Sequence, residues 1–127
     1  MAKKILVIEE DRVNLKLFSE ILRYNGYETL EAENVLEGIR LAMAEKPHLI
    51  LLDIEMTDLN ELKISKIMKS EPSIRDIPVI ALFPFATKWT RKRFLEFGFA
   101  DCITKPFDLH KFIRIVNKHL YGGSSAE

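Results

Sequence analysis

Short apolar runs alternate with segments of helical periodicity along almost the whole chain, and this alternation is the strongest constraint on the fold. Strands are predicted over residues 4–8, 28–32, 49–52, 78–82 and 101–104. The run 49–52 is continuously apolar, which is typical of a parallel strand that is covered on both faces. A predicted helix follows each strand. Five such units in succession indicate an α/β fold, with a doubly wound parallel sheet, helices on both faces and right-handed crossovers.

Capping residues set the expected bounds of the helices. The pair Asn25-Gly26 tolerates positive φ and is expected to end the first helix. Asp58 and Asp108 are expected to cap the third and the last helix. The fourth helix is predicted over residues 87–97. The clearest amphipathic stripe lies in the last helix, at Leu109, Phe112, Ile113, Val116 and Leu120.

Length and charge bound the class of protein. The 127 residues suit one domain, and Lys plus Arg equals Asp plus Glu at 19 each. A neutral balance argues against nucleic acid or an anionic membrane as a partner. No apolar run approaches the roughly 20 residues of a membrane span, and the single cysteine suits a reducing cytosol. We expect a cytoplasmic domain over residues 1–121 and a flexible tail over residues 122–127.

Charged residues follow three of the predicted strands. Glu9 and Glu10 follow the first strand, Asp53 the third and Lys105 the fifth. The carboxyl ends of parallel strands meet at one edge of the sheet, where ligands bind in such folds. Adjacent acids repel one another, so the cluster favours a cation site, and Mg²⁺ needs only one or two protein carboxylates. The alternative is a solvated turn whose acids cap the next helix, which explains Asp11 well.

Several motifs occur in a familiar order and at matching intervals: KKILVIEED, GYETLEA, LILLDIEM, IPVIAL and ITKPF. Over residues 3 to about 120 the chain resembles a bacterial response-regulator receiver domain, the CheY-like or flavodoxin-like fold. The stretch NLKLFSEILRYNGYETLEA is similar to single-domain receivers of the DivK type. The resemblance implies a five-stranded parallel sheet in the order 2-1-3-4-5. It also implies a cis bond between Lys105 and Pro106.

The resemblance assigns a role to each charged residue at the sheet edge. An aspartate at the place of Asp53 accepts a phosphoryl group from a histidine kinase or a phosphotransfer protein, and a lysine at the place of Lys105 holds that group. The implied Mg²⁺ ligands are Glu9, Glu10, Asp53 and the backbone carbonyl of Glu55. The cation and the lysine offset the charge that an acyl phosphate adds to a crowded site.

Three of the positions that depart from the family are called here the switch positions: Phe83, Pro84 and Cys102. In the family, a hydroxyl at the place of Phe83 and the next backbone N–H bond the phosphoryl oxygens, and an aromatic residue stands at the place of Cys102. Phe83 has no hydroxyl and Pro84 has no N–H. Two lost hydrogen bonds to a charged group correspond to roughly 3–6 kcal/mol. Glu10 is one methylene longer than the family's aspartate, so weak Mg²⁺ binding is expected.

These observations predict a receiver in a bacterial two-component phosphorelay, phosphorylated on Asp53 with Mg²⁺, that signals through protein partners with an atypical output switch. The downstream partner is expected on the face made by the fourth helix, the fifth strand and the last helix. Enzymatic activity is expected only as self-catalysed transfer and hydrolysis at Asp53. One alternative is a pseudo-receiver, a binding module that works without phosphorylation. The other is a flavin protein or hydrolase, which the lack of a glycine-rich phosphate loop after the first strand disfavours.

Overall fold

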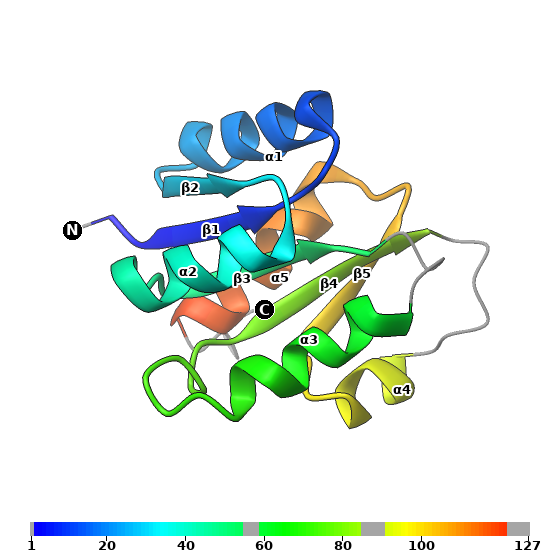
Figure 1. Ribbon diagram of the computed structural model, residues 1–127. Helices are drawn as coiled ribbons and strands as arrows, with labels where there is room; N and C mark the ends of the chain where they lie inside the picture. Colours follow the sequence, from blue (N-terminus) through cyan, green and yellow to red (C-terminus); the bar gives the residue numbers. More distant parts are fainter. Residues whose placement is uncertain (1, 55–58, 85–90, 122–127) are drawn as a thin grey trace.

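The computed structural model describes residues 2–54, 59–84 and 91–121, except for the side chains of residues 59–63 and 84. Strands and helices alternate through these residues, as the sequence predicted (Figure 1). The elements are β1 (Lys4–Ile8), α1 (Arg12–Tyr24), β2 (Glu28–Ala32), α2 (Val35–Glu45), β3 (Leu49–Asp53), α3 (Leu59–Lys69), β4 (Val79–Pro84), α4 (Arg91–Glu96), β5 (Asp101–Lys105) and α5 (Leu109–Tyr121).

The strands form one parallel sheet in the order β2-β1-β3-β4-β5, which confirms the expected fold class and strand order. The strand order reverses at β1, because β2 lies on one side of it and β3 on the other. Ile8 of β1 pairs in register with Leu52 of β3. The residues that follow them, Glu9 and Asp53, therefore lie at the same level of the carboxyl edge of the sheet, where doubly wound folds bind ligands.

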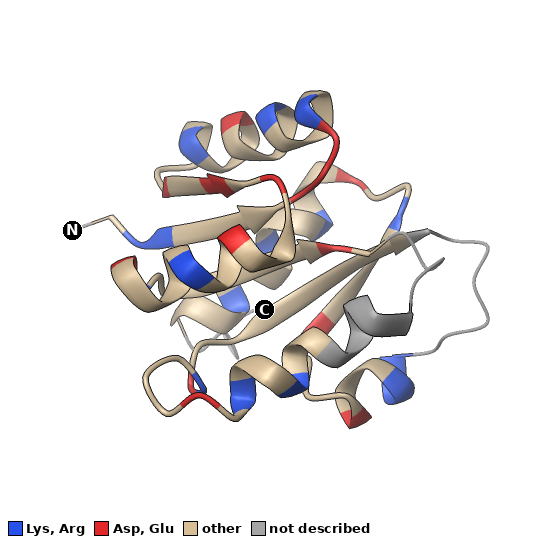
Figure 2. Ribbon diagram, viewed as in Figure 1, with Lys and Arg blue, Asp and Glu red and all other residues tan. Residues whose placement is uncertain are grey.

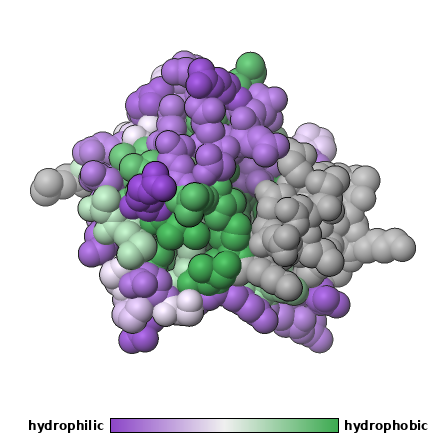
Figure 3. All heavy atoms as spheres, viewed as in Figure 1, coloured by the Kyte–Doolittle hydropathy of each residue, from purple (hydrophilic) through white to green (hydrophobic). Residues whose placement is uncertain are grey.

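Alternate residues of each strand are buried on opposite faces of the sheet. Ile5 and Val7 belong to one core cluster, with residues of α1 and α5. Leu6 and Ile8 belong to the other, which includes residues of α2, α3 and α4. Figure 1 shows the same two layers of helices. Hydrophobic residues remain visible at the surface between α2 and α3 (Figure 3).

Close packing on the second face depends on Gly38 in α2. A Cβ atom at this position would lie 2.3 Å from Cδ1 and 2.7 Å from Cγ1 of Ile8, closer than non-bonded carbon atoms approach in proteins. The glycine therefore lets α2 approach β1 closely, beside the segment that carries the first acids.

The predicted caps agree with the structure where it describes them. Asp11 accepts backbone hydrogen bonds at the start of α1, and Asp108 accepts one from the amide of Lys111 at 2.8 Å. Asn25 follows the last residue of α1, and Gly26 has a φ of +91°. Asp58 lies outside the described residues.

Three strands end later than predicted. β3 runs to Asp53, which pairs with Leu82. β4 runs from Val79 to Pro84 and β5 runs to Lys105, because Phe83 pairs with Thr104 and Pro84 pairs with Lys105. Of the helix predicted over residues 87–97, the structure describes Arg91–Glu96 as helical, while residues 87–90 lie outside the described part.

The predicted apolar stripe of α5 is buried at Phe112 and Val116 and partly buried at Ile113 and Leu120. Leu109, at the start of the stripe, is exposed. Leu109 lines an open groove between α1 and α5 instead of packing in the core.

Candidate functional site

The charged residues predicted to share an edge of the sheet do meet there. Glu9 directly follows β1, Asp53 is the last residue of β3 and Lys105 is the last residue of β5. Figure 2 shows acidic residues after β1 and at the end of β3, and a basic residue at the end of β5, on the same side of the molecule. Glu9, Asp53 and Lys105 are called here the acid–lysine cluster.

An ion pair joins β3 to β5 across the end of β4. The Nζ atom of Lys105 donates to both carboxylate oxygens of Asp53, at 2.7 Å and 2.9 Å. The Asp53 side chain is buried and the Lys105 side chain is partly buried, so the pair is largely shielded from water. The ammonium group of the lysine is placed to pair with the carboxylate and with any further negative charge that is added to it.

Glu9 is the second buried carboxylate of the cluster. Its Oε2 atom accepts a hydrogen bond from the amide of Asp11 at 2.9 Å. Its Oε1 atom is buried and has no hydrogen-bond partner among the described residues. Burial raises the pKa of Glu9 to about 8, and the neighbouring Asp53 carboxylate adds to the shift. An unpaired buried carboxylate oxygen is costly, and a bound cation would satisfy it.

The other predicted metal ligands are placed differently. Glu10 is exposed, whereas Glu9 is buried. Glu55 lies outside the described residues. Within residues 2–54, 59–84 and 91–121, no three histidine, cysteine, aspartate or glutamate side chains gather as a metal site made only of protein ligands would. Mg²⁺ keeps several waters and needs one or two carboxylates, so Glu9 and Asp53 fit it.

Two of the switch positions, Phe83 and Cys102, pack in or against an apolar core cluster. Phe83 is buried, and its ring centroid lies 4.6 Å from that of Phe94 in α4. Cys102 is half-buried against the same core cluster, and burial raises the pKa of its thiol to about 11. The side chain of Pro84 lies outside the described residues, but its backbone pairs with Lys105. Phe83 and Cys102 therefore belong to the packing of the β4–β5 side and offer no hydroxyl.

The bond between Lys105 and Pro106 is cis. This geometry confirms what the resemblance implied.

Comparison with known proteins shows which family the chain belongs to. The family model of the response regulator receiver domain matches residues 5–117. The chain belongs to the response regulator receiver domain family. It is a receiver domain of the two-component signalling type, and the comparisons do not favour the pseudo-receiver alternative or an unrelated enzyme on the same fold.

Curated relatives of this receiver span nearly the whole chain. It is 35% identical to the polar-differentiation response regulator DivK of Brucella anthropi, over 94% of this chain and 98% of that protein. The DivK protein of Brucella ovis is 34% identical over the same shares of both chains. The likeness to DivK-type receivers inferred from the sequence is confirmed.

Solved receiver structures agree with the fold. The receiver domain of a histidine kinase from Syntrophus aciditrophicus superposes with a TM-score of 0.84 at 30% identity, covering 99% of this chain and 96% of that one. The receiver domain of a sensor histidine kinase from Pseudomonas aeruginosa PAO1 gives 0.83 at 25% identity, covering 97% and 100%, and has a magnesium ion coordinated in its active-site cleft.

The structure also shows a charged network in this receiver that the sequence reasoning missed. Asp101, the buried first residue of β5, pairs with Nε of Arg91 at 3.1 Å and with Nε2 of His119 at 3.0 Å. Burial alone would raise the pKa of Asp101, but hydrogen bonds from His119, the Cys102 amide and Arg91 outweigh it and hold the pKa below its usual range. The network joins β5, α4 and α5. The only sequence signal was an aspartate opening a buried strand.

Within the part of the receiver that the structure describes, every helix is too short or too polar to cross a bilayer.

Proposed function

We propose that Asp53 is the phosphoryl acceptor of this receiver and that Lys105 holds the transferred group. The observation that carries this proposal is the contact of Lys105 Nζ with both Asp53 oxygens at the carboxyl edge of the sheet. Family membership supports the same assignment, since the family model matches residues 5–117, a range that includes both Asp53 and Lys105. The donor would be a histidine kinase or a phosphotransfer protein.

The proposed step is a single phosphoryl transfer. A carboxylate oxygen of Asp53 forms the new P–O bond while the P–N bond to the donor histidine breaks. The imidazole nitrogen keeps the bonding electron pair and takes up a proton. Lys105 then pairs with phosphoryl oxygens in place of the free carboxylate, because its ammonium group already lies at hydrogen-bond distance. Hydrolysis by water returns the Asp53 carboxylate and inorganic phosphate, so any catalysis concerns the protein's own aspartate.

Mg²⁺ is the proposed cofactor, and Glu9 and Asp53 are the side chains that would hold it. The unpaired Oε1 atom of Glu9 supports this assignment, because it is a buried carboxylate oxygen without a donor among the described residues. Exposed Glu10 and the backbone carbonyl of Glu55 would be further ligands. When bound, the ion neutralises charge on the phosphoryl oxygens.

We further propose that the downstream partner binds the face made by α4, β5 and α5. A groove with a volume of about 980 Å³ lies on this face. Its lining includes Cys102, Thr104, Lys111, Ile115 and Lys118. The half-buried Cys102 leaves more room there than the family's aromatic residue would, so the output switch is atypical in its shape as well as in its chemistry.

Intact-protein mass spectrometry after incubation with acetyl phosphate and Mg²⁺ tests the acceptor. We expect the mass of one phosphoryl group on the parent protein and its loss on treatment with hydroxylamine, which cleaves acyl phosphates. Asp53→Asn should remain unmodified. Asp108→Asn is the matched control, because asparagine caps a helix as well as aspartate does, and it should be modified like the parent.

Two results would contradict the assignment. One is a phosphoryl group of the same stability on Asp53→Asn. The other is an unmodified parent protein that is shown by circular dichroism to be folded and that binds Mg²⁺.

A further inference from the structure

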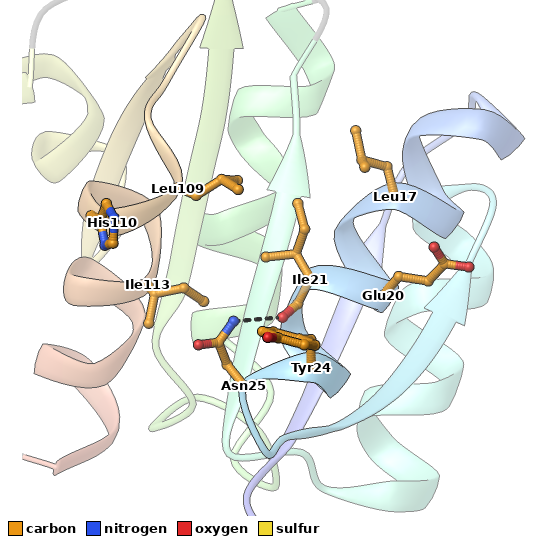
Figure 4. A pocket seen from close by; sticks show the side chains of 8 residues that line it. All are labelled: Leu17, Glu20, Ile21, Tyr24, Asn25, Leu109, His110 and Ile113. Atoms are coloured by element: carbon orange, nitrogen blue, oxygen red, sulfur yellow. Dashed lines mark hydrogen bonds between the residues drawn. The ribbon is translucent and has the colours of Figure 1, made fainter.

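A small pocket that contains two lysines lies at the carboxyl ends of α3 and α4. Its volume is about 400 Å³. It is lined by Lys66, Lys69, Ser70, Glu96, Phe97 and Gly98. It differs from the groove between α1 and α5, whose walls are made mainly by apolar side chains such as Leu17, Ile21 and Ile113 (Figure 4). A lysine in a partly closed pocket reacts as a nucleophile once its amine has lost its proton.

Lys69, the last residue of α3, is held by backbone carbonyls. Its Nζ atom donates to the carbonyl of Arg75 at 3.0 Å and to the carbonyl of Ile77 at 2.9 Å. Among the side chains that the structure describes, no carboxylate lies at ion-pair distance from this nitrogen. Carbonyl oxygens accept from a neutral amine as well as from an ammonium group. Two acceptors use both N–H groups of the neutral amine and leave its lone pair free.

The surroundings of Lys69 favour the neutral amine. The side chain is partly buried, and burial lowers the pKa of Lys69, although the charge of Asp76 opposes the shift. Gly98, with a φ of +97°, lies against the same side chain, since a Cβ atom there would be 3.6 Å from Cγ of Lys69. The backbone after α4 therefore shields the stem of this lysine, while the two carbonyls fix the position of its nitrogen.

Lys66 brings a positive charge to the same pocket. It stands three residues before Lys69, so the two side chains are neighbours on α3. Its Nζ atom lies 5.0 Å from the centre of the Phe97 ring. The acid of the pocket, Glu96, pairs with Nε of Arg93 at 3.7 Å. An ammonium group beside the nucleophile attracts an anionic reagent and pairs with phosphate oxygens. The pocket thus combines an amine with a cation for a negatively charged leaving group.

We propose that Lys69 is a site of acylation and that its acyl donor is an acyl phosphate, such as acetyl phosphate. The Nζ atom of the neutral amine forms a bond to the acyl carbon. The C–O bond between the acyl carbon and the phosphate breaks, and inorganic phosphate leaves with the electron pair. The nitrogen gives one proton to water. Lys66 pairs with the phosphate oxygens of the donor and of the leaving group.

Acylation changes the anchoring of the loop over residues 70–78, between α3 and β4. The acylated nitrogen has no charge and only one N–H, so it donates to only one of the two carbonyls. Ile74 and Ile77 of this loop pack in or against a core cluster, and the loss of one anchor loosens the loop there. The loop precedes β4 and therefore lies at the edge of the sheet opposite to Asp53. The proposal is independent of the function proposed for Asp53.

The acetylation rates of individual lysines test the proposal. The full chain is incubated with acetyl phosphate, folded or unfolded in guanidinium chloride, and peptides cut after glutamate are quantified by mass spectrometry. Lys69 should react at least about threefold faster in the folded protein, because burial favours its neutral amine only there. Lys92, an exposed residue of α4, is the internal control and should react no faster when folded. Equal or slower reaction of Lys69 in the folded protein overturns the proposal.

A charge variant tests the preference for an acyl phosphate. Lys66→Gln should slow acetylation of Lys69 by acetyl phosphate at least about threefold, and should leave its acetylation by an uncharged ester unchanged. Lys92→Gln removes a positive charge outside the pocket and is the matched control, and circular dichroism checks the fold of both. Equal slowing by the two variants, or equal slowing of both reagents by Lys66→Gln, contradicts the assignment of the donor.

Two further measurements separate this site from the phosphoryl site. Asp53→Asn should be acetylated on Lys69 at the parent's rate, and acetyl and phosphoryl adducts differ in mass, so either transfer can fail without hiding the other. A slower reaction of Lys69 in this variant contradicts the independence of the two sites. Hydrogen exchange over residues 70–78 should be faster in the acetylated protein than in the parent. Unchanged exchange contradicts the loosening of the loop.

Discussion

The acid–lysine cluster and two of the switch positions, Phe83 and Pro84, lie at the same edge of the sheet, yet they differ in chemistry. Glu9, Asp53 and Lys105 are buried or partly buried polar groups whose contacts cross from one strand to another. Phe83 is buried as well, but its ring packs against Phe94. One set has the carboxylates and the lysine of the proposed phosphoryl site, while the other has apolar residues where the resemblance implies hydrogen-bond donors.

Under the function proposed above, acceptance of a phosphoryl group and its readout depend on separate residues of one edge. The ion pair of Lys105 with Asp53 requires only that β3 and β5 end at the same level. Readout in the family requires a hydroxyl and an N–H at the end of β4, where this chain has Phe83 and Pro84. The second set can therefore change without disturbing the first.

The sharpest test of the comparison restores the missing donors. The double variant Phe83→Thr with Pro84→Ala introduces a hydroxyl and an N–H together. Two hydrogen bonds to a charged group correspond to roughly 3–6 kcal/mol, so affinity for beryllofluoride with Mg²⁺ should rise by more than about a hundredfold. Isothermal titration calorimetry measures the affinity, and circular dichroism checks the fold. If a folded double variant binds no more tightly than the parent, the limit lies in the acid–lysine cluster.

The packing of Phe83 can be broken on its own. Phe83→Ala should lower the free energy of unfolding by about 3–5 kcal/mol, because it leaves a cavity beside Phe94. Equilibrium unfolding in urea gives the value. Leu36→Ala removes an exposed hydrophobic side chain, so it should change the free energy by less than about 0.5 kcal/mol. A similarly small loss for Phe83→Ala would mean that its ring contributes little to the core.

Within the acid–lysine cluster, Glu9 predicts a pH dependence. Its pKa in the folded state is raised from 4.5 to about 8, so its contribution to stability is complete below pH 4.5 and is lost as the pH rises to 8. In metal-free buffer the loss from Glu9 follows a slope of about 1.4 kcal/mol per pH unit, or roughly 2–3 kcal/mol between pH 6 and pH 8. Glu9→Gln should remove this slope in urea unfolding measured at both pH values. An unchanged slope would show that Glu9 ionises normally.

A second buried carboxylate with charged partners lies at the first residue of β5, where Asp101 pairs with residues of α4 and α5. Asp101→Asn should lower the free energy of unfolding at pH 7 by about 2 kcal/mol, because hydrogen bonds to a charged group are weakened at Arg91 and His119. The pKa of Asp101 is depressed. Its contribution is thus present above the unfolded pKa near 4 and is lost as the pH falls further. The parent and the variant should therefore converge in stability at acid pH. A difference that persists unchanged there would rule out this ionisation as its source.

Much of the fold could be predicted because its signals are local. Apolar runs, capping residues and the Asn25-Gly26 pair are read from neighbours in the chain, and the strands that they predicted agree with the structure to within two residues. The ends of β4 and β5 were predicted too early, because Phe83 and Lys105 are strand residues only through their pairing with the adjacent strand. Spacing places Leu109 in the apolar stripe of the last helix, whereas its position over an open groove depends on α1.

The sequence alone determined the alternation of strands and helices, the chemistry available at the sheet edge and the loss of donors at Phe83 and Pro84, since these depend on residue type and order. Only the tertiary structure decided which acid is buried. Glu9 turns inward and Glu10 outward, because the direction of each side chain depends on where β1 ends against its neighbours. The tertiary structure also decided the contact between Lys105 and Asp53, which are 52 residues apart. It likewise decided the contacts of Asp101 with Arg91 and His119. Such pairs have no local signal, because only the packing of distant elements brings their charges together.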